Sequence, residues 1–295
     1  MSLSNLVKLI VLSAIWGSSF LFVRMAAHDL APPFLIAMRV GLGSLFLLAV
    51  ACVQKRTLDW RAHWKHFLIL GFLNTAVPFT LFAFAARTLP ASLMSILNAT
   101  APIFGAVISA VWLRVPMTWK SGLGLALGIG GVAILVGLDG GNLTSAAGLA
   151  IAAGLVAGFC YGLASAYAKH APSVDGFSNA HGSMWAATLF MIPTAPFFAP
   201  VHIPAPMIIL AVVAVGVMCS GIAYILYYDL VNAIGVAPAL SVGFLIPVFG
   251  VLWGHLFLHE PVGLQTVAGG AVVLLGTALI TGFNPASLMR SKVPA

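Results

Sequence analysis

The residue best suited to chemistry is Arg39, which lies near the start of the second long apolar stretch of the chain. A full charge in apolar surroundings is costly, so such a residue usually serves a function. Its planar guanidinium can hold a carboxylate through two parallel hydrogen bonds. We expect Arg39 to face the outer mouth of an internal cavity and to attract or orient a carboxylate. The alternative is a structural role, either snorkelling to the interface or pairing with Asp29.

Aromatic and small polar side chains lie at comparable depth in other apolar stretches. Trp16 and Tyr161 occupy matching positions in the first and sixth stretches. Their rings could stack on a ligand or contact a cation, although packing explains them equally well. Small polar groups at this depth usually face protein or a water-filled cavity, because lipid offers them no hydrogen-bond partner. The predicted ligand-binding residues are Trp16, Ser18, Arg39, Asn74, Asn98 and Tyr161.

Prolines inside apolar stretches and a cluster of tyrosines are candidates for bending and gating. A proline in the middle of a helix removes one backbone donor and tends to bend the helix. Pro102 and Pro247 occupy matching positions, so we expect related bends that widen a central cavity. Tyr224 and Tyr228 lie beside Asp229, which favours an aromatic belt at the membrane interface; a cytoplasmic gate is the alternative. The predicted bending and gating residues are Pro78, Pro102, Pro247, Tyr224 and Tyr228.

Several kinds of chemistry lack the residues that they need. None of the 6 acidic residues falls in the middle of an apolar stretch, whereas proton relays use acids at depth. The sequence contains no metal-ligand spacing and no phosphate-binding Gly-Lys-Ser/Thr loop. Ser18 and Ser19 have no base or orienting group at a catalytic spacing. We expect no metal, no cofactor and no enzymatic activity; coupling through His or Arg and simple facilitation stay open.

Membrane-spanning helices must position these residues. Charged residues make up 6% of the 295-residue chain and apolar ones 61%, with a mean hydropathy of +1.10. A soluble domain carries about 25% charged residues, so this chain cannot cover a water-facing surface. One bilayer crossing needs roughly 20 apolar residues. Ten stretches meet that need, at roughly 6–25, 34–53, 67–86, 91–112, 118–138, 147–168, 179–198, 207–230, 236–257 and 262–283.

The ten stretches form two copies of a five-stretch unit, in which residue i corresponds to residue i+145. Pro-Ile-Phe-Gly at 102–105 corresponds to Pro-Val-Phe-Gly at 247–250, and Gly17 corresponds to Gly162. An odd number of crossings per copy turns the second copy upside down. The predicted fold is an all-α membrane protein with ten transmembrane helices, arranged as two inverted five-helix repeats around a central cavity. The expected parts are a first repeat at 1–140, a second at 141–285 and a cytoplasmic tail at 286–295.

The basic residues are distributed unevenly between the two sides of this arrangement. Ten Lys and Arg residues fall on the side of the termini, and only Arg24 and Arg87 fall on the other. Because loops rich in Lys and Arg stay cytoplasmic, we expect both termini in the cytoplasm and the chain in the inner membrane of a bacterium. The net charge of +7 reports this topology, and no nucleic-acid partner is expected. Glycines in stretches five and ten favour packing within the chain over a dimer surface, so a monomer or a homodimer is expected.

Several short segments together resemble the EamA-domain proteins of the drug/metabolite transporter superfamily. The matching segments are 14–20 (Ala-Ile-Trp-Gly-Ser-Ser-Phe), Pro33, Arg39, 102–105, Pro247 and 258–261 (Leu-His-Glu-Pro). The resemblance covers nearly the whole chain as two EamA repeats and extends to YddG-type amino-acid exporters. It implies an exporter of amino acids or other small metabolites. The family usually places a Glu after the fourth span of each repeat; this chain has Glu260 but Val115, which suggests a structural role for Glu260.

The predicted function is a secondary transporter that exports small amphipathic metabolites, amino acids first, by alternating access. Its partners would be a small-molecule substrate and the lipid bilayer. Multidrug efflux, efflux of another metabolite and facilitation in the same fold are the alternatives. A carboxylate-driven antiporter of organic cations is disfavoured, because the small multidrug relatives use a Glu in the first span. An intramembrane enzyme is disfavoured because no nucleophile, base and orienting group converge.

Overall fold

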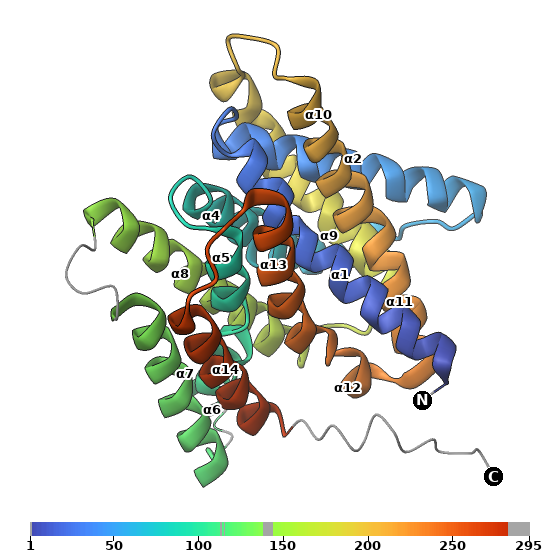
Figure 1. Ribbon diagram of the computed structural model, residues 1–295. Coiled ribbons are helices and arrows are strands. Elements are labelled where there is room, and N and C mark those ends of the chain that lie inside the picture. The colour runs from blue at the N-terminus through green and yellow to red at the C-terminus, as the bar shows by residue number, and fades with distance from the viewer. Residues whose placement is uncertain (1, 113, 115, 138–143, 283–295) are drawn as a thin grey trace.

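The computed structural model describes residues 2–112, 114, 116–137 and 144–282, which form helices and connecting loops without a β-strand (Figure 1). The first half contains α1 (Leu3–Ala26), α2 (Pro32–Val53), α3 (Trp60–Gly71), η1 (Phe72–Ala76), α4 (Val77–Ala85), α5 (Ala91–Asn98), α6 (Ala101–Trp112) and α7 (Trp119–Gly137). The second half contains α8 (Ser145–Ala168), α9 (Gly176–Met191), η2 (Ile192–Phe198), α10 (Pro206–Val213), η3 (Ala214–Ile222), α11 (Ala223–Ile234), α12 (Val236–Ala239), α13 (Val242–Leu258) and α14 (Leu264–Thr281). Val115 and the expected tail at 286–295 lie outside the described residues.

Most of these helices have the length and composition of membrane spans. Seven helical segments are long and apolar enough to cross a bilayer, namely Leu3–Ala26, Pro32–Val53, Trp60–Ala85, Ala91–Trp112, Ser145–Ala168, Pro206–Ile234 and Leu264–Thr281. Trp119–Leu135 and Val242–Leu258 are shorter apolar helices, and α9 has 16 residues. The described residues are thus all-helical and rich in spans, whereas the count of ten crossings stays a prediction.

Helix starts are defined by local sequence. The side chain of Thr144 accepts a hydrogen bond from the backbone N–H of Ala147, and that of Asp175 accepts one from Ser178. Such caps satisfy backbone donors that the first turn of a helix leaves free. Helix α2 instead begins at Pro32, whose missing N–H costs nothing in a first turn.

The two halves exchange equivalent helix contacts. Gly17 of α1 lies against the backbone of α13, where an added Cβ would come within 3.1 Å of the Gly250 nitrogen. Gly162 of α8 lies in the same way against α6, where an added Cβ would come within 2.7 Å of the Gly105 nitrogen. These two pairs are related by the 145-residue offset of the sequence. Small residues allow such close approach, and the reciprocal contacts indicate an approximate two-fold relation between the halves.

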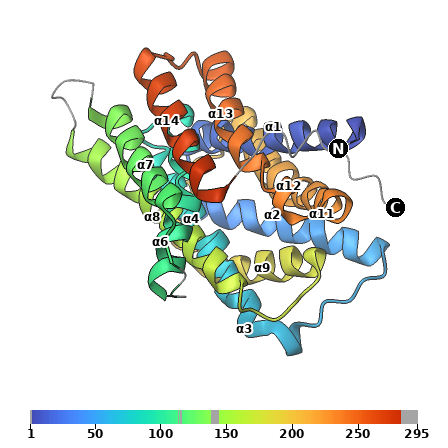
Figure 2. The ribbon, with the colours of Figure 1, turned by 90° about the horizontal axis from the view of Figure 1, so that it is seen from below.

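Helices α7 and α14 lie side by side at one edge of the molecule (Figures 1 and 2). Their glycines meet reciprocally: a Cβ at Gly124 would lie 2.6 Å from the Gly276 carbonyl, and one at Gly131 would lie 2.9 Å from the Gly269 carbonyl. Glycine seams of this kind hold membrane helices together by close backbone packing. The seam is therefore used within the chain, as expected.

Both halves contain a π-helix at corresponding positions, η1 in the third stretch and η3 in the eighth. Pro78 stands directly after η1, at the start of α4, and it has no N–H to donate to the preceding turn. The wider π turn accommodates this loss. In η3 the hydroxyl of Ser220 donates to the Val215 carbonyl at 2.9 Å. A π turn shifts the side chains that follow it around the helix axis, compared with an unbroken α-helix.

Helices are interrupted just before both prolines. Helix α5 ends at Asn98 and Pro102 lies in the first turn of α6, whereas α12 ends at Ala239 and Pro247 lies further inside α13, which begins at Val242. At the first interruption Thr277 of α14 donates a hydrogen bond to the Ala99 carbonyl at 2.8 Å. Related bends at the two prolines stay a prediction.

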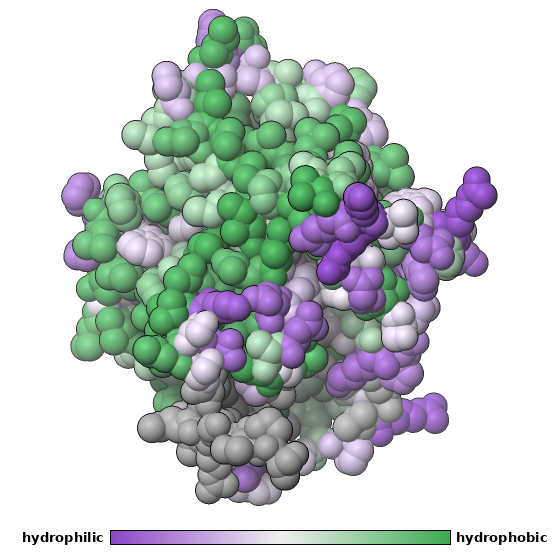
Figure 3. Space-filling model, turned by 90° about the vertical axis from the view of Figure 1, so that its right-hand side faces the viewer, coloured by the Kyte–Doolittle hydropathy of each residue, from purple (hydrophilic) through white to green (hydrophobic). Residues whose placement is uncertain are grey.

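The surface is apolar over wide areas, as a bilayer requires. Figure 3 shows hydrophilic residues gathered in its lower and right-hand parts, with apolar surface over most of the rest. Near the N-terminus Lys8 forms an ion pair with Asp229. At the same end the ammonium of Lys169 donates to the Ser109 hydroxyl at 3.1 Å. Charged groups of α1, α8 and α11 therefore gather at the end of the bundle that carries the N-terminus.

Candidate functional site

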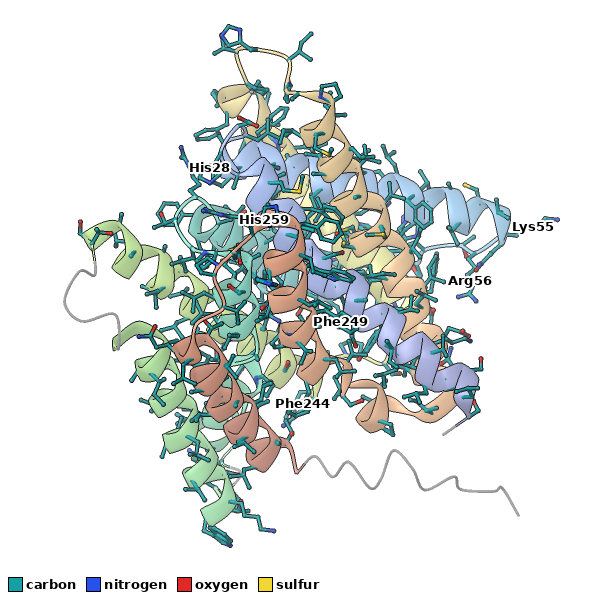
Figure 4. The ribbon with its side chains drawn as sticks, viewed as in Figure 1. His28, Lys55, Arg56, Phe244, Phe249 and His259 are labelled. Atoms are coloured by element: carbon teal, nitrogen blue, oxygen red, sulfur yellow. The ribbon has the colours of Figure 1, made fainter. Side chains whose placement is uncertain are left out.

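A cavity of about 1140 Å³ lies between the two halves of the chain. It exceeds the ~300–1,000 Å³ of a typical ligand pocket because it is open at one end. The exposed residues Met117, Lys169 and Leu240 line that opening, at the end of the bundle that carries the N-terminus. Phe244 also lines the cavity and lies toward the lower end of α13 in Figure 4, below Phe249.

The opposite end of the cavity is closed by packed side chains. Phe20 of α1 and Phe82 of α4 meet edge to face with their ring centroids 5.4 Å apart. Above them the Arg24 guanidinium donates to the Ala86 carbonyl. His28 and His259 mark this closed end near the top of α1 and α13 (Figure 4). The cavity therefore has an opening at one end and packed side chains at the other.

Glu260 ties the closed end together. Its carboxylate accepts hydrogen bonds from the backbone N–H groups of Ala91 (2.6 Å) and Ser92 (3.1 Å) and from the Ser92 hydroxyl (2.9 Å). A carboxylate at a helix N-terminus satisfies free donors and complements the helix dipole. Glu260 is buried and caps α5 from the loop that follows α13. This geometry supports the structural role expected for it.

Arg39 is buried, with 6% of its surface exposed, and lines the closed end of the cavity. Its Nε donates to the Ser220 hydroxyl at 2.9 Å, and its Cζ lies 3.6 Å from the centre of the Phe79 ring. Among the described residues, none accepts a hydrogen bond from its two terminal nitrogens, and none forms an ion pair with it. The pairing with Asp29 considered from the sequence is not formed. The fork of the guanidinium is thus free to hold an anion.

The π-helix η3 decides where Arg39 is held. Ser220 donates to the Val215 carbonyl five residues earlier, so its oxygen keeps a lone pair for Arg39. Cys219, the residue before it, accepts a hydrogen bond through its carbonyl from the indole of Trp16 at 3.1 Å. Two adjacent residues of one π-helix therefore orient both Arg39 and Trp16.

An aromatic wall lines the cavity beside Arg39. The Trp16 ring lies 5.9 Å from Tyr224 and 5.4 Å from Tyr227, and Tyr227 lies 5.3 Å from Tyr228. All four side chains line the cavity. The tyrosine cluster, for which the sequence favoured an interfacial belt, thus faces the interior. Ring faces at this spacing can stack on apolar groups or attract cations.

Other predicted residues are divided between the cavity and the packing around it. Tyr161, Asn74, Asn98 and Pro102 line the cavity. Neither asparagine amide forms a hydrogen bond with another described residue, so both amides are available to a ligand. Ser18 donates instead to the Ile15 carbonyl at 2.7 Å in a helix seam, and its neighbour Ser19 lines the cavity. Pro78 is buried and Pro247 lies within α13; neither lines the cavity.

Sequence reasoning missed Phe79, Cys219 and Ser220. No sequence pattern marks them as site residues. Their roles depend on which side of a π turn they occupy. Ser220 lies within the π-helix η3, in the repeat opposite to that of Arg39. Only the packing of the two halves brings them together.

The charge of the cavity has one sign. The described residues that line it include the cations Arg39 and Lys169 and no Asp or Glu. No group of three or more His, Cys, Asp or Glu side chains gathers as metal ligands would in the described part of the chain. The two buried histidines are held in packing: His66 lies 3.1 Å from the Asn179 side-chain oxygen, and His181 accepts from Trp185 at 2.9 Å.

An all-helical bundle of apolar spans around a cavity that is open at one end is an architecture typical of membrane transporters. The chain belongs to the EamA-like transporter family, whose model matches residues 4–137 and again residues 148–282. The two matches coincide with the two halves whose glycine contacts are exchanged.

Relatives agree with this class. A protein of Bacillus subtilis named uncharacterized transporter YvbV is 26% identical over 270 residues, covering 90% of this chain and 87% of its own. A protein of Streptantibioticus cattleyicolor named a probable terminal-alkyne amino-acid exporter is 27% identical over 285 residues, covering 95% and 94%. A crystal structure matches the fold with a TM-score of 0.65 at 18% identity, over 94% of this chain and 98% of its own.

Proposed function

We propose that this transporter exports small amphipathic metabolites that carry a carboxylate, with amino acids the first to test, by alternating access. The observation that carries the proposal is the buried guanidinium of Arg39. No described residue accepts from its terminal nitrogens, and the described residues that line the same cavity include no Asp or Glu. An uncompensated buried charge is unfavourable, so an anionic group of the substrate would stabilise the site as it binds.

The lining suggests how such a substrate would lie. Its carboxylate would accept from the fork of Arg39, and its apolar part would pack on the ring faces of Trp16, Tyr224 and Tyr227. Asn74 and Asn98 would bind an ammonium or hydroxyl group through their amides. The relative named as an amino-acid exporter supports this substrate class. Multidrug efflux and efflux of other metabolites are the alternatives in the same fold.

The direction of transport follows from the predicted topology. We infer ten crossings and cytoplasmic termini, because Lys8, Lys55, Arg56 and Lys169 belong to the side rich in basic residues. The cavity opening, which lies at the N-terminal end, would then face the cytoplasm and accept substrate there. The location would be the inner membrane of a bacterium, with the chain as a monomer or a homodimer.

Alternating access would arise by rocking of the halves around the cavity. The closed end is held by Phe20 against Phe82 and by Glu260 on α5, contacts that must loosen before outward release. The glycine seam between α7 and α14 lies away from the closing contacts and would act as a fixed support. The 1–140 and 141–285 repeats would be the moving parts.

Counterflow in proteoliposomes tests the proposal. Purified protein is reconstituted with an unlabelled amino acid inside, and uptake of the labelled compound is followed across a panel of amino acids, other carboxylates and cationic drugs. We expect saturable uptake of at least one carboxylate and recovery of the label in unchanged form. Uptake of cations alone would overturn the proposed substrate class. Chemical conversion of the compound would instead indicate an intramembrane enzyme.

A further inference from the structure

The aromatic wall has the composition of a site for organic cations. Trp16, Tyr224 and Tyr227 present their rings around one part of the cavity, with centroid separations of 5.4 and 5.9 Å from Trp16. The indole of Trp16 is held in place by the Cys219 carbonyl, so the wall is preorganised. Aromatic faces attract cations through their quadrupole, and clusters of them bind quaternary ammonium groups. Judged by the aromatic wall alone, the cavity would therefore bind cationic amphiphiles.

One cation already lies over another aromatic ring that lines the same cavity. The guanidinium of Arg39 lies over the Phe79 ring, with its Cζ 3.6 Å from the centroid, and it is anchored through Ser220. Arg39 and Trp16 are thus tied to adjacent residues of η3, which places the fixed charge beside the aromatic wall. In the part of the chain that the structure describes, no Asp or Glu lines the cavity to offset that charge. A second cation entering the cavity would meet repulsion in surroundings that screen charges poorly.

We propose that Arg39 is a built-in cation that excludes organic cations from an otherwise cation-competent aromatic cavity, and so determines which charge class the transporter accepts. The proposal rests on the proposed function in placing substrates in this cavity. The inference goes beyond the proposed function, because it assigns to Arg39 the choice between carboxylate export and multidrug efflux. Removing the charge uncovers the Phe79 ring as well as relieving the repulsion, so two effects act in the same direction.

Equilibrium binding of radiolabelled tetraphenylphosphonium to purified protein in detergent tests this inference without requiring transport. The variants are Arg39→Met, which introduces the residue at the corresponding position of the second repeat, and Arg39→Lys, which keeps the charge. We expect Arg39→Met to bind the cation at least about tenfold more tightly than the original protein, and Arg39→Lys to show no gain. Adding Trp16→Leu to Arg39→Met should remove most of the gain, because it removes one ring of the wall.

A third variant keeps the test decisive if Arg39→Met does not fold. Asn98→Asp adds an acid to the cavity lining at nearly constant volume while Arg39 stays in place, and it should also tighten cation binding. The inference is overturned if Arg39→Met is folded and binds no better, or if Arg39→Lys gains as much. It is equally overturned if Arg39→Met fails to fold and Asn98→Asp gains nothing. Failure of carboxylate counterflow in the original protein would reject the proposed function alone, since cation binding is measured separately.

Discussion

The guanidinium of Arg39 is held across the interface of the two halves by the hydroxyl of Ser220, at 2.9 Å from Nε. The hydroxyl donates its single proton to the Val215 carbonyl of the same π-helix, so toward Arg39 it acts only as an acceptor. Arg39 lines the cavity, and no described residue accepts a hydrogen bond from its two terminal nitrogens. The hydrogen bond between Arg39 and Ser220 thus connects a charged side chain of the first repeat to the π-helix of the second.

Replacement of Ser220 should weaken substrate binding by releasing Arg39. Ser220→Ala removes one hydrogen bond to a charged group, which is worth ~1.5–3 kcal/mol, so KM should rise by about tenfold or more. Ser220→Thr keeps the hydroxyl and should stay near the original value. Counterflow kinetics measure both.

The matched control is Ser183→Ala. Ser183 is also a buried serine, but its hydroxyl donates to the Ala180 carbonyl of its own helix and contacts no charge. It should leave KM unchanged. If Ser220→Ala and Ser183→Ala behave alike, Ser220 does not position Arg39.

Arg39 should contribute through its charge and its fork. Arg39→Lys keeps the charge without the planar pair of donors, and should reduce carboxylate transport partially. Arg39→Met should reduce it by about 10- to 100-fold, because a charge-assisted hydrogen bond contributes ~1.5–3 kcal/mol. Flux must be divided by the amount of inserted protein. Normal flux in Arg39→Met after this correction would leave snorkelling or packing as its role.

Replacing the buried Glu260 or the paired Asp229 by its amide should affect protein stability to different degrees but leave transport largely intact. Glu260→Gln cannot accept from Ala91 and Ser92 with both of its terminal atoms, so unfolding should be easier by ~1–3 kcal/mol. Asp229→Asn loses only the exposed pair with Lys8, worth ~0–1 kcal/mol. Thermal unfolding in detergent measures the first effect. Both variants should retain substantial flux per folded molecule; complete loss in Asp229→Asn would place a proton site or gate at the N-terminal end.

The glycine seam provides a matched pair of neighbouring positions. A Cβ at Gly131 would lie 2.7 Å from the Val273 nitrogen, whereas one at Gly130 would meet no atom within 4 Å. Gly131→Ala should therefore destabilise the protein by ~1–3 kcal/mol through overpacking. Gly130→Ala should be neutral or slightly stabilising, since alanine favours a helix. Equal unfolding temperatures for the two variants would show that α7 and α14 do not pack as described.

The predicted topology can be checked by thiol labelling. Cys52 is exposed and is replaced by Ser before single cysteines are introduced at Thr57 and His202, which are both exposed. A membrane-impermeant reagent should label position 202 in intact cells and position 57 only after the membrane is opened. Labelling of position 57 in intact cells would reverse the orientation and make the cavity face outward.

The sequence by itself determined the class of architecture. Low charge and long apolar stretches demand helices in a bilayer, and the 145-residue repeat predicted two related halves in which Gly17 corresponds to Gly162. Arg39 stood out because a charge is costly at that depth, and Trp16 and Asn98 because polar and aromatic groups there seek a cavity. These inferences depend on local composition, which a chain carries without being folded.

Tertiary structure alone decided how these residues are used. The tyrosines of α11 face the cavity instead of the interface, Ser18 turns into a helix seam, and Pro102 lines the cavity whereas Pro247 lies within α13. Ser220 reaches Arg39 only because a π turn in one repeat faces α2 of the other. Rotation about a helix axis and the partner across an interface depend on the packing of distant segments, and no local pattern encodes either one.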